Sequence, residues 1–114
     1  MKLKEADEQA VVIEYCAFKN LPIFAIPNGG SRHKLEAINL KRQGVKAGVP
    51  DLFLPIASSG KHGLFLEMKV KPNKPTKMQL EWQERLNSIG YLAVVCYGAD
   101  EAIKVIDDYL GGRA

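Results

Sequence analysis

The sequence predicts a single α/β domain in which helices flank a mixed central sheet. The chain has 114 residues, of which 46% are hydrophobic, and this suits one compact core. Segments with helical periodicity alternate with short β-rich apolar runs. Two of these runs form a hairpin, and a helical crossover then leads to a further strand. Such an arrangement gives a sheet that contains both strand directions.

The first part of the chain predicts two helices with a short strand between them. From Glu5 to Asn20, apolar residues recur at spacings of three and four, which indicates an amphipathic helix. Ile23 to Pro27 reads as a short strand, and residues 28–31 have the composition of a turn. A second, basic helix is expected from about His33 to Gln43, ended by Gly44.

The middle of the chain predicts a β-hairpin followed by a capped helix. Asp51–Ile56 and Leu64–Val70 are strand-like, and residues 57–63 between them have the composition of a hairpin loop. The two strands should therefore pair antiparallel. Residues 76–79, Thr-Lys-Met-Gln, have the spacing of a capping box that opens a helix. This helix is expected to bury four apolar side chains, Met78, Trp82, Leu86 and Ile89.

The last part of the chain predicts a strand and a helix. Tyr91–Tyr97 is strongly apolar, as is typical of a strand covered on both faces. Asp100 is expected to cap a final helix that ends before residues 111 and 112, both glycine. This helix should turn three side chains inward, Ile103, Ile106 and Leu110.

Composition excludes several classes of protein. The longest apolar segments, such as Leu92–Cys96, are far shorter than the roughly 20 residues needed to cross a bilayer, and the first residues show no signal-like region. Cys16 and Cys96 lie in apolar surroundings, which favours buried reduced thiols over a disulfide or a metal pair. We therefore expect a cytoplasmic protein, in a bacterial or phage-infected cell.

Positive charge is concentrated in the middle of the chain. The net charge is +3, but the segment from Arg32 to Lys77 holds ten Lys and Arg against three acidic residues. Clustered positive charge suits a polyanion such as nucleic acid, because neutralising phosphates releases counterions. The alternative is a solvated basic face without a partner.

Three charged residues stand where apolar strands are expected. Side chains alternate across a strand, so Glu67 and Lys69 point to the same face, and the hairpin can place Asp51 beside them. Two adjacent carboxylates repel each other unless a cation neutralises them, and hard oxygen ligands suit Mg²⁺ or Mn²⁺. Such a cation can activate water for attack on a phosphate, with Lys69 orienting the water or offsetting charge. Alternatively, Glu67 and Lys69 are an exposed strand pair and Asp51 is a turn residue.

These motifs resemble a known family of nucleases. Residues 48–51 (Gly-Val-Pro-Asp), residues 65–69 (Phe-Leu-Glu-Met-Lys) and Gln79 are similar to the VRR-NUC family within the PD-(D/E)XK superfamily. The resemblance covers essentially the whole chain, including the Asn-Gly-Gly turn at 28–30 and the Gly-Tyr strand entry at 90–91. It implies a restriction-endonuclease-like αβββαβ core.

The resemblance also implies roles for individual residues. Asp51 and Glu67 would be the ligands of Mg²⁺ or Mn²⁺, the backbone carbonyl of Met68 would complete the coordination, and Lys69 would be the catalytic lysine. A glutamate of the first helix would be the third acidic group. Glu8 is slightly preferred to Glu5, although both lie on one helix face and either could simply favour the helix N-terminus.

Other residues keep two interpretations. Gln79 either caps its own helix or lies beside the active site, as the family places a glutamine there. Trp82 is expected in the core rather than as a platform for bases, and His33 and His62 have no metal-site spacing. The candidate phosphate contacts are basic residues on loops or helix ends, namely Arg32, His33, Lys34, Lys46, Lys71 and Lys74.

By this resemblance we expect a metal-dependent, structure-specific DNA endonuclease that hydrolyses phosphodiester bonds in branched DNA such as Holliday junctions, in repair or recombination. Small members of the family resemble junction resolvases, which implies a homodimer that matches a two-fold symmetric substrate. One alternative is a flap or nicking nuclease of a phage or mobile element. Another is a DNA-binding module without activity, against which the presence of Asp51, Glu67 and Lys69 argues.

Overall fold

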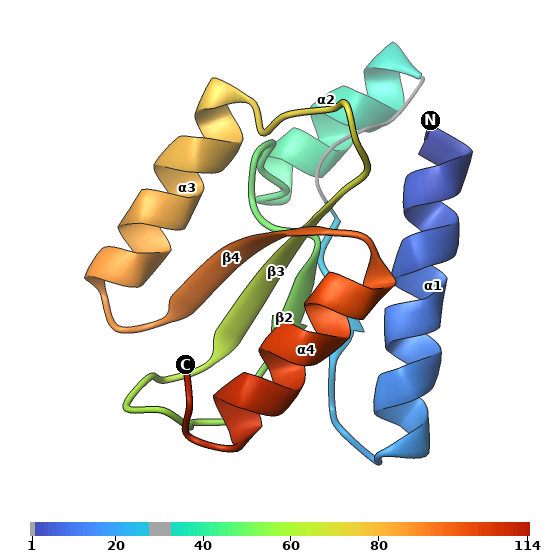
Figure 1. Cartoon of the computed structure of the whole chain (residues 1–114). Coiled ribbons are helices and arrows are strands. Elements are labelled where there is room, and N and C mark those ends of the chain that lie inside the picture. Colours follow the sequence, from blue (N-terminus) through green and yellow to red (C-terminus); the bar gives the residue numbers. More distant parts are fainter. Residues whose placement is uncertain (1, 28–32) are drawn as a thin grey trace.

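The computed structural model of the chain describes residues 2–27 and 33–114. In these residues, eight elements follow one another in the predicted order (Figure 1). Their bounds are α1 Lys2–Phe18, β1 Phe24–Ala25, α2 Lys34–Arg42, β2 Leu52–Leu54, β3 Leu64–Lys69, α3 Lys77–Ser88, β4 Leu92–Tyr97 and α4 Ala99–Leu110. The expected α/β fold is confirmed, although each element begins or ends within a few residues of its predicted bounds. No helix in the described ranges is long and apolar enough to span a membrane.

A four-stranded mixed sheet lies at the centre, in the order β1-β2-β3-β4. β2 pairs antiparallel with β1 and β3, whereas β3 pairs parallel with β4. The predicted hairpin is therefore the pair β2 and β3, and α3 is the crossover that lets β4 run parallel to β3. Both the hairpin and the mixed sheet predicted from the sequence are confirmed.

One face of the sheet forms the hydrophobic core with α1 and α4, which both lie on that side of the sheet (Figure 1). The strand residues of this core are Leu52, Leu54, Leu64, Leu66, Met68 and Cys96, each at most 1% exposed. The helices contribute Val12, Cys16, Ala102, Ile106 and Tyr109. Cys16 and Cys96 are both buried and unpaired, as expected. The alternation of β3 leaves Phe65, Glu67 and Lys69 for the opposite face.

That opposite face is covered less completely, by α3. The expectation that α3 buries four apolar side chains is correct only for Leu86. Met78 and Ile89 are 51% and 58% exposed, and Trp82 is half-buried. A helix about 10 Å wide spans only about two strands of a sheet, so residues at its ends and sides stay outside the contact. The side of α3 that faces α2 is consequently open.

The cap of α4 differs from the prediction. Asp100 lies inside the first turn of α4, and the N-cap residue is Gly98, with a positive φ of 92°. The backbone N–H of Ala99 donates a hydrogen bond of 2.7 Å to Glu8 Oε1, so a side chain of α1 takes the capping role. A partner 91 residues away gives no local signal, which is why the prediction chose the nearest acidic residue. The capping box of α3 is confirmed.

Candidate active site

The hairpin brings Asp51 and Glu67 together on the α3 side of the sheet. Leu52 stands opposite Leu66, so Asp51, one residue before β2, falls opposite Glu67. Side chains of directly opposed residues share a face and lie about 5 Å apart. The backbone of β3 holds the Asp51 carboxylate, because its Oδ2 accepts a hydrogen bond of 2.7 Å from the N–H of Met68. The meeting of the two carboxylates that the hairpin predicts is therefore present.

Lys69 completes a buried charged group. Its Nζ lies 3.9 Å from Glu67 Oε2, and the two side chains are only 11% and 8% exposed. The structure therefore excludes the alternative in which Glu67 and Lys69 form an exposed strand pair. Charged groups are rarely buried to this extent unless they are paired or bind an ion, because each loses its hydration. One lysine faces two carboxylates here, so the group carries an excess of negative charge.

The electrostatics of the pair show that excess. Burial, and then the charge of Asp51, raise the pKa of Glu67 from 4.5 to about 8, although Lys69 acts in the opposite direction. The pKa of Asp51 is also raised, chiefly by burial, while the hydrogen bond from Met68 lowers it. The two carboxylates thus retain a proton near neutral pH. A divalent cation would replace that proton and relieve the repulsion.

The donor set fits a hard cation that is only partly held by protein. Asp51 and Glu67 supply carboxylate oxygens. The backbone N–H and C=O of a strand residue point toward the same neighbouring strand. Since the N–H of Met68 donates to Asp51, the carbonyl of Met68 also points to the side of Asp51. Within the described residues, no three or more His, Cys, Asp or Glu side chains form a complete metal cage. Mg²⁺ characteristically takes one or two carboxylates and completes its shell with water and substrate phosphate, so this set suits it.

The two candidate glutamates of α1 have different surroundings. Glu5 contributes to the raised pKa of both Asp51 and Glu67, so its charge acts on the site. Its Oε2 also accepts a hydrogen bond of 3.2 Å from the side-chain amide of Asn73. Glu8 instead caps α4 through Ala99. The geometry therefore favours Glu5 as the third acidic group, against the slight preference for Glu8 drawn from the sequence. Nothing in the sequence marked Asn73 as the partner of Glu5.

Gln79 satisfies both of its interpretations at once. Its Oε1 accepts a hydrogen bond of 2.8 Å from the N–H of Thr76, and its own N–H donates one of 3.2 Å to Thr76 Oγ1. The other end of the amide, Nε2, donates a hydrogen bond of 3.1 Å to Glu67 Oε2. The capping box therefore fixes the side chain that orients Glu67.

The basic candidates surround this end of the sheet. β2 begins where its antiparallel partner β3 ends, so the segments before Asp51 and after Lys69 emerge side by side. The first segment carries Lys46 and the second carries Lys71 and Lys74. All three are exposed, as are His33 and Lys34 at the start of α2. Arg32 lies outside the described residues.

The remaining candidates lie elsewhere. His62 packs edge-on against Tyr91, with ring centroids 5.5 Å apart, and its N–H donates to the carbonyl of Gly90. His62 therefore joins the loop between β2 and β3 to the turn between α3 and β4, the hydrogen bond coming from its backbone N–H. Trp82 is only half-buried, which departs from its predicted place in the core.

An α/β fold with paired carboxylates and a lysine at one end of a hairpin defines a nuclease-type domain. Comparison with known proteins identifies the family. Residues 4–100 match the family model of the VRR-NUC domain. A solved structure described as a VRR_NUC domain protein is 35% identical, with a TM-score of 0.82 over 95% of this chain and 88% of that one. The chain belongs to the VRR-NUC family. No curated protein matches it.

Proposed function

We propose that this protein is a metal-dependent endonuclease that hydrolyses phosphodiester bonds in DNA. The observation that carries the proposal is the buried group of Asp51, Glu67 and Lys69, which holds two carboxylates against one ammonium. The family membership supports a nuclease, and the basic residues around this end of the sheet support a phosphate-bearing substrate.

Asp51, Glu67 and the carbonyl of Met68 would hold Mg²⁺ or Mn²⁺. When bound, such a cation supplies a water of lowered pKa and neutralises charge on the phosphate. The protein itself positions the two carboxylates. Met68 N–H holds Asp51 and Gln79 Nε2 holds Glu67, so both carboxylates are oriented before a ligand arrives.

Lys69 provides a positive charge beside the two carboxylates. Its ammonium is nearly buried beside Glu67, where low dielectric strengthens its interactions. From this place, Nζ can donate a hydrogen bond to the attacking water or to a phosphate oxygen as negative charge develops. Glu5 adds a further carboxylate near the pair, held by Asn73.

We propose branched DNA, such as a four-way junction, as the substrate. Phosphate contacts from exposed loop and helix-end lysines position DNA without reading its sequence. Recognition would then depend on shape, and a homodimer would match the two-fold symmetry of a junction.

A panel of labelled substrates tests this function. We expect the purified protein, with Mg²⁺ or Mn²⁺, to cut four-way junctions in preference to flaps, linear duplex and single strands, and to stop cutting in EDTA. A preference for flaps or single nicks would select that alternative activity and overturn the junction preference. Binding without any cleavage would overturn the nuclease proposal. Light scattering on the free protein tests the dimer.

A further inference from the structure

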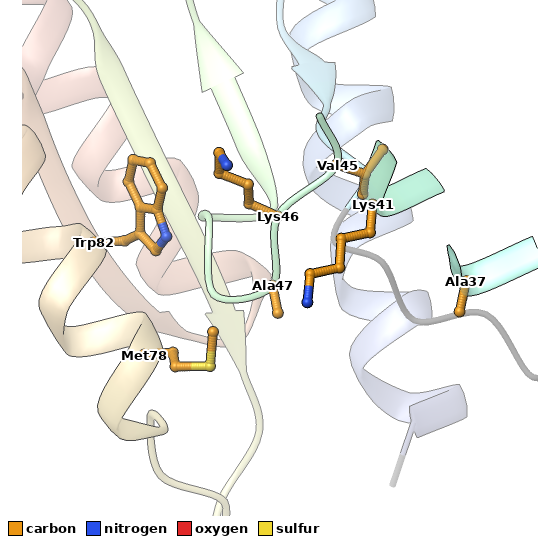
Figure 2. Close-up of a pocket in the computed structure, with 7 residues that line it drawn as sticks. All are labelled: Ala37, Lys41, Val45, Lys46, Ala47, Met78 and Trp82. Carbon is orange, nitrogen blue, oxygen red and sulfur yellow. The ribbon is translucent and has the colours of Figure 1, made fainter. Parts of the chain in front are cut away.

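A pocket of about 430 Å³ opens between α2, residues 45–47 and α3 (Figure 2). Figure 2 shows the Trp82 indole and the Met78 side chain projecting from α3, while Lys41 and Lys46 come from the opposite wall. Both lysines and Met78 are exposed, and Trp82 is half-buried. The pocket thus lies along the side of α3 that faces α2, because the two helices do not pack against each other there.

The walls combine apolar and cationic surfaces. Trp82, Met78 and Ala47 present an indole, a thioether and a methyl group, whereas Lys41 and Lys46 supply two ammonium groups. Among the described residues that line this pocket, none is acidic. The guanidinium of Arg85 lies 5.7 Å from the centre of the Trp82 ring, in an adjacent pocket that Glu81 also lines. A ligand that fits this surface has a flat apolar part and a negative charge.

The pocket is connected to the active site through both of its walls. Met78 directly precedes Gln79, whose amide holds Glu67. On the other wall, Ala47 is followed by Gly48, where an added Cβ would lie 2.9 Å from the backbone of Met78. A second groove, lined among others by Gly48, Met78 and Gln79, adjoins the pocket. This groove shares Ala47 and Met78 with the pocket, and its Gln79 donates a hydrogen bond to Glu67 of the carboxylate pair.

We propose that this pocket holds an unpaired nucleotide of the nucleic acid being cut, with its base against Trp82 and its phosphates at Lys41 and Lys46. The proposal rests on the proposed function and names the substrate feature that the site selects. Every base has an apolar π-face that stacks on an aromatic side chain, and adjacent lysines attract the backbone. Bases in a continuous duplex are paired and stacked on one another, so a base enters the pocket at least cost where that stacking is interrupted, as at the branch point of a junction.

Binding can be measured without cleavage. Trp82 is the only tryptophan of the sequence, so all tryptophan fluorescence of the protein comes from this side chain. In EDTA, we expect a short single-stranded oligothymidylate to quench this fluorescence. A blunt duplex of the same length should change it much less. Thymidine monophosphate should quench it weakly at high concentration, since it has the base and one phosphate but no neighbouring nucleotides.

Two sets of variants separate the contributions of the pocket. Lys41→Ala with Lys46→Ala leaves Trp82 as the reporter and changes only exposed side chains; it should weaken oligothymidylate binding and its salt dependence. Trp82→Leu, followed by anisotropy of a labelled oligothymidylate, should weaken binding about fivefold or more, and Trp82→Phe should weaken it less because a ring remains. Lys104→Ala, at an exposed position of α4, is the matched control and should bind normally.

Three results would overturn the proposal. The first is that a blunt duplex quenches the Trp82 fluorescence as strongly as the single strand does. The second is that the double lysine variant binds oligothymidylate as tightly as wild type. The third is fluorescence that changes on dilution of the protein but not with oligothymidylate, which would assign the pocket to contact between two copies. If the quenching occurs as expected but no substrate is cut, the pocket stands and the nuclease proposal fails.

Discussion

The side-chain amide of Gln79 links helix capping to the carboxylate of Glu67. Its Oε1 accepts from the backbone of the cap residue, which leaves Nε2 directed at Glu67 Oε2, 3.1 Å away. An amide held at one end loses little further freedom when its other end binds. The start of α3 therefore orients a carboxylate of the candidate active site.

Replacing the two partners of this capping box should separate its two effects. Thr76→Ala removes the cap and should lower the free energy of unfolding by about 1 kcal/mol, with cleavage largely retained. Gln79→Ala should cost a similar amount of stability and also reduce cleavage, because Glu67 loses its donor. Chemical denaturation and initial rates on a junction substrate measure both. Equal activity of the two variants would mean that the contact with Glu67 has no role in cleavage.

Loss of either charge at the centre should stop the reaction without removing the substrate. We expect Lys69→Ala and Asp51→Ala to abolish cleavage, whereas junction binding in a gel-shift assay stays close to wild type because exposed lysines make the phosphate contacts. Lys104→Ala, whose ammonium pairs with Asp108 on α4, is the control and should cut normally. Cleavage by Lys69→Ala would contradict the role given to the lysine.

The raised pKa of Glu67 should appear in the pH dependence of stability. Between its usual value of 4.5 and about 8, the folded protein keeps a proton that the unfolded chain has lost. The contribution of Glu67 to the free energy of unfolding therefore falls as pH rises through this range. In EDTA, the melting temperature of wild type should fall more steeply between these pH values than that of Glu67→Gln.

Divalent cation should reverse this behaviour. Binding requires the ionised carboxylates, so Mn²⁺ should raise the melting temperature of wild type more at pH above 8 than near pH 6. Glu67→Gln should show little or no Mn²⁺ effect at either pH. Parallel curves for wild type and Glu67→Gln, with and without Mn²⁺, would show that Glu67 neither holds the proton nor binds the ion.

The two glutamates of α1 should have opposite phenotypes. Glu8→Ala removes the cap of α4 and should lower the free energy of unfolding by about 1 to 2 kcal/mol, with cleavage retained. Glu5→Ala removes negative charge near the carboxylates, so it should leave stability nearly unchanged or raise it, and should reduce cleavage. Denaturation and cleavage measured side by side test this. Loss of cleavage in Glu8→Ala alone would restore Glu8 as the third acidic group.

The sequence predicted those features that depend on neighbours along the chain. Strand alternation put Glu67 and Lys69 on one face, the hairpin brought Asp51 to them, and the spacing of Thr76 and Gln79 identified the capping box. These relations span few residues, and local periodicity determines them.

Relations between distant segments could not be predicted in this way. Glu5 and Glu8 lie one turn apart on the same helix face, and only the packing of α1 decides which meets Asn73 and which meets Ala99. In the same way, the helical spacing of Met78 and Trp82 indicates an apolar side of α3 but not how far the sheet beneath it extends. Both corrections come from tertiary packing, which periodicity does not contain.

The cap that Glu8 provides for α4 also affects the order in which parts of the chain can fold during synthesis. During synthesis α1 leaves the ribosome before α4, but its apolar side chains Val12 and Cys16 share their core with α4. The hairpin with Asp51, Glu67 and Lys69 is complete well before α4 exists. A nascent chain that stops short of Ala99 therefore carries all three charged groups without the helix pair that buries the other face of their sheet. Competence for catalysis should consequently arrive only with the final helix.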